Sequence, residues 1–169
     1  MKKIILITLA MFCTIFAGCR PNSGNKFYNT TPKSFRYQYS GMMAHPIFSY
    51  EVETKEDGKL TLAYSTGGPD ITIIKAPDNL LQTIGEIVRN NKIYKIKSHY
   101  MPDMEILDGY GWSMSIEYAD GYISSGGSNA GPGGDISAGI SLILKSLKEV
   151  VDNATPEDVI GTDSFFNRK

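Results

Sequence analysis

Several segments of this chain alternate apolar and polar residues with a period of two, and this pattern constrains the fold most strongly. The clearest examples are 35–39, 48–55, 60–65 and 112–118, and the apolar stretch 70–75 reads as a further strand. Such alternation is typical of strands that have one buried and one solvated face, as in an antiparallel sheet. The chain is therefore predicted to form a sheet that is mainly antiparallel.

Two Asp-Gly pairs in the sequence predict the turns of two hairpins. At the first pair, a three-residue loop ending at Gly58 places Val52 opposite Leu62 and keeps charged side chains on the other face. A two-residue loop there would mix apolar and charged side chains. At the second pair, a two-residue loop over Asp-Gly places Tyr118 opposite Ile123, apolar against apolar.

Two segments have apolar residues at helical spacing. The first is predicted to open at Pro77 and to end at Asn90-Asn91, and the second to run from an N-cap at Asp135 to about Asn153. The Gly-rich stretch 124–134 reads as a connection between hairpin and helix. The predicted fold class is α+β, an antiparallel sheet of about six strands with two amphipathic helices packed on one face. A small β-sandwich with appended helices is the alternative.

The first nineteen residues have the layout of a secretory signal peptide. Lys2 and Lys3 precede an apolar run, and the small residues Ala17 and Gly18 stand directly before Cys19. The apolar run has about a dozen residues, well short of the ~20 that a membrane-spanning helix needs. The ending resembles a bacterial lipobox, in which the cysteine is lipidated and becomes the mature N-terminus. A plain cleaved signal peptide is the alternative.

These features predict how the chain is organised and where it resides. Residues 1–18 are expected to be the lipoprotein signal peptide, 19–33 a flexible tether, 34–153 a single α+β domain and 154–169 a C-terminal tail. Lipidated Cys19, carrying palmitate or similar acyl chains, would anchor the protein to the membrane. Arg20, in place of the Asp that retains lipoproteins in the inner membrane of enteric bacteria, favours the outer membrane, facing the periplasm.

Composition argues against several functional classes. The chain has 17 Lys and Arg against 18 Asp and Glu, so it lacks the basic excess that nucleic-acid binding requires. Its only cysteines, Cys13 and Cys19, lie within or at the end of the leader, which excludes a disulfide framework or a thiol nucleophile in the folded domain. No cofactor and no metal is expected. The partners expected are the membrane and an envelope protein, a glycan or a small ligand.

One acidic loop is a candidate for chemistry. Asp103, Glu105 and Asp108 follow His99 closely, and paired carboxylates can act as general acid and base. An envelope hydrolase that uses the carboxylates of this 99–108 loop is therefore the alternative function. A solvated acidic loop is the simpler interpretation, and the sequence contains no recognised catalytic motif.

A candidate ligand-binding rim lies where two loops flank the second hairpin. Its residues are Asp108, Trp112, Ser128, Asn129 and Asp135. Both loops are expected at the hairpin end opposite the turn, beside the N-terminus of the last helix, where polar groups would meet an apolar surface. The competing interpretation is that Asp108 and Asn129 only tie the loops together by hydrogen bonds. Trp112 is expected to be a core residue whose indole N–H is satisfied by a nearby loop.

Three runs in the second half of the chain resemble a recurring pattern, namely 107–112, 116–121 and 125–132. They are similar to an uncharacterised bacterial lipoprotein family, of the Bacteroidetes type, with a Trp-led hairpin and a Ser-Gly-x-Asn-x-x-Pro-like loop. The resemblance covers about 34–153 and implies no activity. The expected function is a membrane-anchored envelope lipoprotein that acts as a non-catalytic binding or interaction module.

Overall fold

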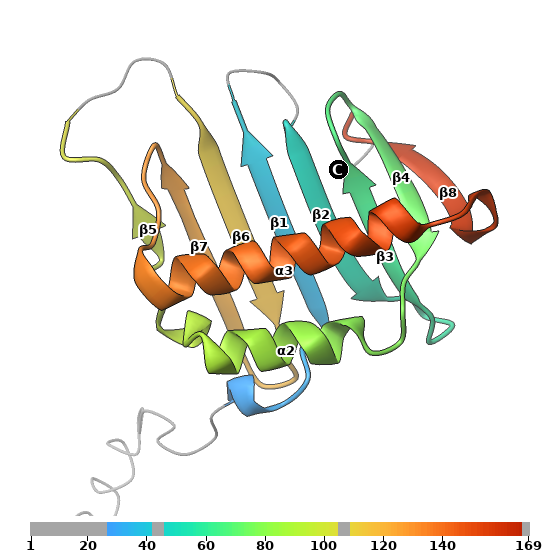
Figure 1. Ribbon diagram of the computed structural model, residues 1–169, viewed down its shortest axis with the longest axis horizontal. Helices are drawn as coiled ribbons and strands as arrows, with labels where there is room; N and C mark the ends of the chain where they lie inside the picture. Colours follow the sequence, from blue (N-terminus) through green and yellow to red (C-terminus); the bar gives the residue numbers. More distant parts are fainter. Residues whose placement is uncertain (1–26, 42–45, 105–108, 167–169) are drawn as a thin grey trace, which may run out of the picture.

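The computed structural model describes residues 27–41, 46–104 and 109–166, and the predicted lipobox with Cys19 lies outside the described residues. The described chain forms an α+β fold with an eight-stranded, mostly antiparallel sheet that does not close into a barrel. Figure 1 shows the strands side by side, with two helices crossing them. The strands are β1 Ser34–Ser40, β2 Phe48–Thr54, β3 Leu60–Ser65, β4 Asp70–Lys75, β5 His99–Tyr100, β6 Gly111–Glu117, β7 Tyr122–Ser128 and β8 Val159–Ser164.

The strand order is β5-β7-β6-β1-β2-β3-β4-β8, which places the N-terminal strand in the middle of the sheet. Strand β1 pairs antiparallel with β2 on one side and with β6 on the other. The only parallel pair among the described strands joins β5 to β7. The helices are α2 Leu80–Asn90 and α3 Gly134–Asn153, and three short 3-10 helices are η1 Phe27–Asn29, η2 Ile93–Lys95 and η3 Pro156–Asp158.

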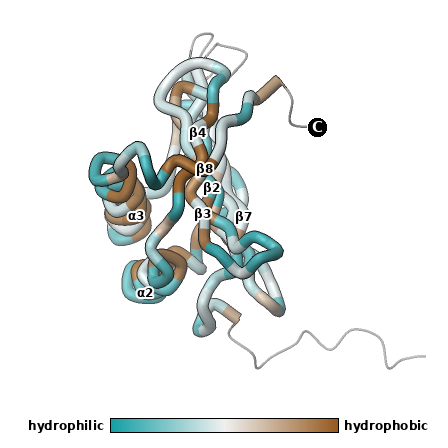
Figure 2. Tube along the Cα trace, turned by 90° about the vertical axis from the view of Figure 1, so that its right-hand side faces the viewer, coloured by the Kyte–Doolittle hydropathy of each residue, from teal (hydrophilic) through white to brown (hydrophobic). Residues whose placement is uncertain are grey.

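Both helices lie on the same side of the sheet, as Figure 2 shows edge-on. Alternate residues of the central strands point toward them and are buried, with Phe35 and Ile116 fully inaccessible to solvent. The intervening residues face the other way, and no described helix covers that side, which is called the open face below. In the described part of the chain, no helix is both long and apolar enough to cross a membrane. The helix-facing core comprises Phe35, Tyr37, Tyr50, Val52, Leu60, Leu62, Ile74, Leu80, Leu81, Ile84, Val88, Ile93, Trp112, Met114, Ile116, Tyr118, Ile123, Ile140, Ile143 and Leu147.

The first hairpin has the predicted three-residue loop. Val52 pairs with Leu62 and Tyr50 with Tyr64, so each face keeps one kind of side chain. Gly58 has a φ of 80°, the left-handed conformation that closes such a loop at little cost for glycine.

The second hairpin forms, but the predicted register is wrong by two residues. Ile116 pairs with Ile123, and the Tyr118 N–H donates to the Gly121 carbonyl at 2.8 Å, so the turn residues are Ala119 and Asp120. A shift of two residues leaves every side chain on its face, so the alternation does not distinguish the two registers. Gly121 serves another purpose, because a Cβ there would lie 2.8 Å from the ring of Phe27.

The last part of the expected tether is packed against the domain. The Phe27 ring meets Tyr118 edge-on at 5.4 Å, and the Tyr28 ring stacks on Tyr94 at 4.0 Å. Pro32 is buried, and the Lys33 N–H donates to the Glu117 carbonyl at 2.7 Å. The packed part of the chain therefore includes residues 27–33, upstream of the predicted start at residue 34, because these aromatic side chains find apolar partners.

The chain after residue 153 also belongs to the sheet. Strand β8 pairs with β4 over Asp70–Ile74 and forms one edge of the sheet, where the sequence predicted only a tail. The two-residue strand β5 at the other edge was likewise not predicted. Part of the Gly-rich connection is strand β7, whose glycines pair with β6. Helix α2 begins at Leu80, three residues after Pro77, with Asn79 as its N-cap.

Candidate functional site

The structure divides the predicted rim between the two faces of the sheet. Trp112 pairs with Gly127 and points toward α3, where it is 9% exposed. Ser128 is the next residue along the extended strand, so its side chain points to the open face. Asp108 lies outside the described residues. Trp112 and Ser128 therefore do not share one rim.

Asn129 ties together the two loops that flank the hairpin. Its side-chain Oδ1 accepts a hydrogen bond from the Tyr110 N–H at 2.9 Å, and its own N–H donates to the Tyr110 carbonyl at 2.9 Å. Asn129 has a φ of 52°, a left-handed conformation that Asn tolerates better than most residues. Gly109 packs against this amide, since a Cβ there would lie 2.0 Å from Asn129 Oδ1. This geometry supports the competing interpretation, a structural role, for Asn129.

Asp135 is not the N-cap of the last helix, as the sequence predicted. The N-cap is Gly133, with extended backbone, and the helix begins at Gly134, which has a φ of 57°. The Asp135 side chain is largely exposed and lies 4.0 Å from the Lys92 ammonium group. As an anion in the first turn of the helix, Asp135 interacts favourably with the helix dipole. None of the interactions described for Asp135 involves Trp112 or Asn129.

Replacing Asn129 with Ala is expected to lower the free energy of unfolding by about 1–2 kcal/mol, because the variant loses one hydrogen bond and alanine tolerates a left-handed conformation less well than asparagine. Asn129→Asp is the matched control, because a carboxylate oxygen can still accept from Tyr110. Urea denaturation measures both. Equal stability of the Ala and Asp variants would contradict the structural role.

Trp112 lines a small pocket on the helix-covered side of the sheet, called the aromatic pocket below. This pocket of about 300 Å³ is formed by rings from β1 and β6, by the loop after β7 and by α3. The indole N–H of Trp112 donates to the Ala130 carbonyl at 2.7 Å, as expected for a buried tryptophan. The residues that line the aromatic pocket are Tyr37, Tyr39, Tyr110, Trp112, Ala130, Gly131, Pro132, Ser137, Ile140, Ser141 and Leu144.

Gly127 makes the contact between Trp112 and the loop possible. A Cβ at this position would lie 2.4 Å from the Ala130 carbonyl oxygen and 2.7 Å from the indole nitrogen. Only a glycine leaves room for the hydrogen bond between them. The Gly-rich segment therefore serves close packing around the indole ring.

The tyrosines of the aromatic pocket take part in two stacked pairs of rings and differ in exposure. Tyr39 stacks on Tyr110 at 5.3 Å between ring centroids, and Tyr37 stacks on Trp112 at 6.3 Å. Tyr37 is buried, and this burial raises the pKa of its hydroxyl to about 12, with the nearby Tyr39 and Tyr110 hydroxyls adding to the rise. Tyr110 is 38% exposed, so its ring is the part of the stack most accessible to a ligand.

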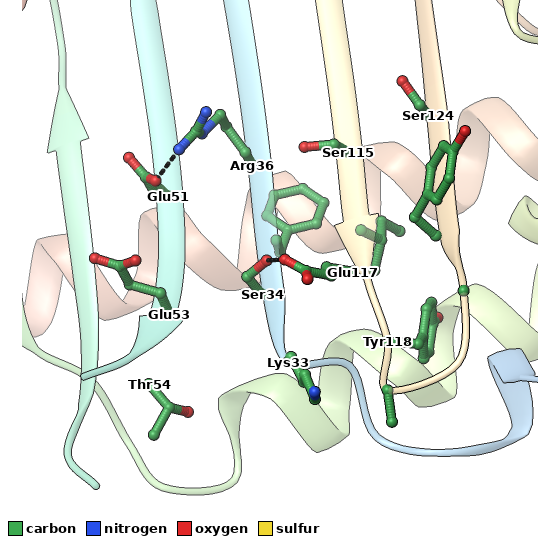
Figure 3. A pocket seen from close by; sticks show the side chains of 15 residues that line it. Lys33, Ser34, Arg36, Glu51, Glu53, Thr54, Ser115, Glu117, Tyr118 and Ser124 are labelled. Atoms are coloured by element: carbon green, nitrogen blue, oxygen red, sulfur yellow. Dashed lines mark hydrogen bonds and ion pairs between the residues drawn. The ribbon is translucent and has the colours of Figure 1, made fainter. Parts of the chain in front are cut away.

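A larger cavity, of about 760 Å³, lies on the open face and is called the polar cavity below. Figure 3 shows its side chains rising from β1, β2, β6 and β7. Arg36 forms an ion pair with Glu51, and the Ser34 hydroxyl donates to Glu117 Oε2 at 3.4 Å. The residues that line the polar cavity are Lys33, Ser34, Phe35, Arg36, Glu51, Glu53, Thr54, Ser115, Ile116, Glu117, Tyr118, Ala119, Gly121, Tyr122 and Ser124.

The strand register arranges these polar side chains in two rows across the sheet. One row joins Glu53, Ser34 and Glu117, which are partners across β2, β1 and β6. The next row joins Glu51, Arg36, Ser115 and Ser124 in the same way. Charged side chains therefore stand around a floor of small hydroxyl groups.

The acidic loop of the alternative, hydrolytic function is described only in part. His99 lies in β5 beside Gly126, and both His99 and Asp103 are exposed. Glu105 and Asp108 lie outside the described residues. Among the residues that are described, no group of three His, Cys, Asp or Glu is close enough to hold a metal ion.

Sequence reasoning missed most residues of both cavities. The alternation correctly placed Arg36 and Glu51 on a solvated face, but their convergence depends on β1 lying between β2 and β6. Tyr39 and Tyr110 come together for the same reason, since Ser40 pairs with Gly111. Only the strand order brings these residues together, and no local sequence pattern indicates the strand order.

The sequence was also compared with known proteins. No model of a known protein family matches the chain, and no curated protein matches it.

Proposed function

We propose that this protein is a lipid-anchored module of the bacterial outer membrane that faces the periplasm and binds a ligand without transforming it. Cys19 carries the lipid, and the aromatic pocket receives the ligand. The observation that supports the binding role is that this pocket joins aromatic rings to the hydroxyl groups of Ser137 and Ser141 on α3. Apolar walls with a few placed polar groups are what small-ligand sites require.

The pocket suits a compact ligand with one flat apolar ring. Its volume of about 300 Å³ is at the lower end of the ~300–1,000 Å³ range of ligand pockets. The partly exposed Tyr110 ring offers a surface on which a flat ring can stack, and such a contact is worth about 0.5–1.5 kcal/mol beyond area burial.

The segment that leads into β1 and the aromatic pocket lie at opposite ends of this strand. The segment before β1 packs beside Glu117 and Tyr118, at the end of the sheet where β1 begins. Tyr39 and Tyr110 belong to the other end of the same strand, where the sheet extends past α3 (Figure 1). Because only eight residue steps separate Cys19 from Phe27, the anchor can lie at most about 28 Å from the domain.

The anchoring is tested by metabolic labelling with a palmitate analogue. The wild-type protein is expected to be labelled and to sediment with the outer membrane, whereas Cys19→Ala should lose both properties. Cys13→Ala is the matched control, because this cysteine lies within the expected leader. Labelling of the Cys19→Ala protein would contradict the proposal.

Ligand entry can be followed through Trp112, because it is the single tryptophan of the chain. Titration with benzamide, benzyl alcohol and p-cresol is expected to change Trp112 emission saturably for at least one compound. Tyr110→Ala should weaken that binding several-fold, in line with the ~0.5–1.5 kcal/mol of a ring contact. Tyr122→Ala, on the open face, should leave it unchanged. Unaltered emission with all three compounds would contradict the proposed pocket.

A further inference from the structure

We propose that the polar cavity is a second binding site, separate from the aromatic pocket, and that it takes a neutral polyhydroxylated ring, namely a saccharide unit. The two cavities lie on opposite faces of the sheet, since Trp112 of the aromatic pocket points to the helices and Ser115 of the polar cavity to the open face. The volume of about 760 Å³ lies within the range of small-ligand sites and exceeds that of the aromatic pocket.

The charges around the cavity favour a neutral ligand over an ion. Its lining carries the cations Lys33 and Arg36 and the anions Glu51, Glu53 and Glu117. Arg36 is paired with Glu51, and Lys55 at the margin is paired with Glu53. With the charges nearly balanced, the cavity has no strong field of one sign that would select a cation or an anion.

The same groups suit the hydroxyl groups of a sugar. Each sugar hydroxyl both donates and accepts, and the cavity offers carboxylates that accept beside a guanidinium group that only donates. Hydrogen bonds to charged groups are roughly twice as strong as those between neutral groups. Arg36 and Glu51 are partners on adjacent strands and form an ion pair, so a ligand can contact both groups at one place.

The floor and the margin of the cavity also match a ring-shaped ligand. Ser34, Ser115 and Ser124 are small, so a ligand can approach the sheet closely while meeting hydroxyl groups. At the margin, the side chain of Tyr122, the first residue of β7, is 74% exposed. An exposed aromatic ring beside polar groups provides a stacking surface for the apolar face of a sugar.

The test uses the full chain in lauryldimethylamine oxide micelles, a detergent that contains no sugar. The probes are maltotriose, cellotriose and triacetylchitotriose, observed by saturation-transfer difference NMR. At least one trisaccharide is expected to receive saturation from the protein. Arg36→Gln should lower its affinity at least tenfold, and Ser115→Gln, which fills the floor from an exposed position, should abolish binding.

Lys148→Gln is the matched control, because Lys148 also forms an exposed ion pair, with Asp152 on α3. This variant should bind like the wild type. The absence of saturation transfer to all three trisaccharides would overturn the proposal, as would binding that survives in both Arg36→Gln and Ser115→Gln.

Trp112 emission distinguishes this site from the aromatic pocket. Saccharide binding in the polar cavity should leave the emission unchanged, because the indole ring lies on the other face of the sheet. A trisaccharide that alters the emission and loses affinity in Tyr110→Ala would assign the sugar to the aromatic pocket. That result would overturn the second site while supporting a ligand-binding role for the first.

Discussion

Tyr118→Phe is expected to stabilise the protein by about 1 kcal/mol at pH 8 and by about 3 kcal/mol at pH 12. The Tyr118 side chain is 2% exposed, and its hydroxyl has no hydrogen-bond partner among the described residues. A buried polar group without a partner costs free energy, so its removal helps the folded state. Burial raises the pKa of Tyr118 to about 12, although the nearby Arg89 opposes the rise.

The raised pKa makes the folded state sensitive to alkali. In the unfolded chain tyrosine ionises near pH 10, so between pH 10 and 12 the unfolded state loses its proton first and stability falls with rising pH. Below pH 10 the Tyr118 hydroxyl is protonated in both states and the linked contribution to the free energy of unfolding is fully present. About 2 kcal/mol of that contribution is lost by pH 12. Tyr37, whose pKa is also raised to about 12 by burial, should add a similar loss.

Urea unfolding of both proteins at pH 8 and pH 12 measures this difference. Tyr122→Phe is the control, because Tyr122 is exposed and its replacement should not change the alkaline loss. If the wild type and Tyr118→Phe lose the same free energy of unfolding between these two pH values, the pKa of Tyr118 is not raised.

Ending the chain after Asp158 is expected to lower the free energy of unfolding by about 3 kcal/mol or more. The truncation removes β8, which pairs with β4 at Ile71 and Ile74, two residues that are 2% and 0% exposed. Each isoleucine that returns to water costs up to ~1.5–3 kcal/mol. Strand β4 would also become a bare edge containing Ile71, Ile73 and Ile74, which favours aggregation.

The control for this truncation ends the chain after Phe166, which keeps β8 whole. That protein should melt like the wild type, whereas the shorter one should melt at a lower temperature and associate at high concentration, as seen by calorimetry and light scattering. An unchanged melting temperature after loss of β8 would show that 154–169 is only a tail.

The two hairpins show how far the alternation of side chains predicts structure. In the first hairpin, moving the register by one residue would place Leu62 opposite Glu53, so the pattern selects the observed pairing. In the second, a shift of two residues changes no face, and the observed register brings Gly121 against the Phe27 ring. That contact joins residues nearly a hundred positions apart, so no local pattern contains it.

The edges of the sheet and the cavities could not be predicted for related reasons. Strand β8 carries a bulge opposite Ile73 and Ile74 and has exposed Val159 and Ile160, so it lacks a clean alternation. Strand β5 has only two residues. Trp112 and Asn129 of the predicted rim both lie near the loop that follows β7. Side chains alternate along β7, however, so Ser128 points to the opposite face from Trp112.

The central position of β1 has a mechanical consequence. Strand β1 is hydrogen-bonded on both sides, to β2 and to β6, and the segment that leads to the proposed anchor enters at its first residue. These hydrogen bonds run perpendicular to the strand. A ligand held at the far end of the sheet and pulled away from the membrane would load β1 along its length. The hydrogen bonds from β1 to β2 and to β6 would then be loaded in shear, all at the same time, instead of breaking one after another.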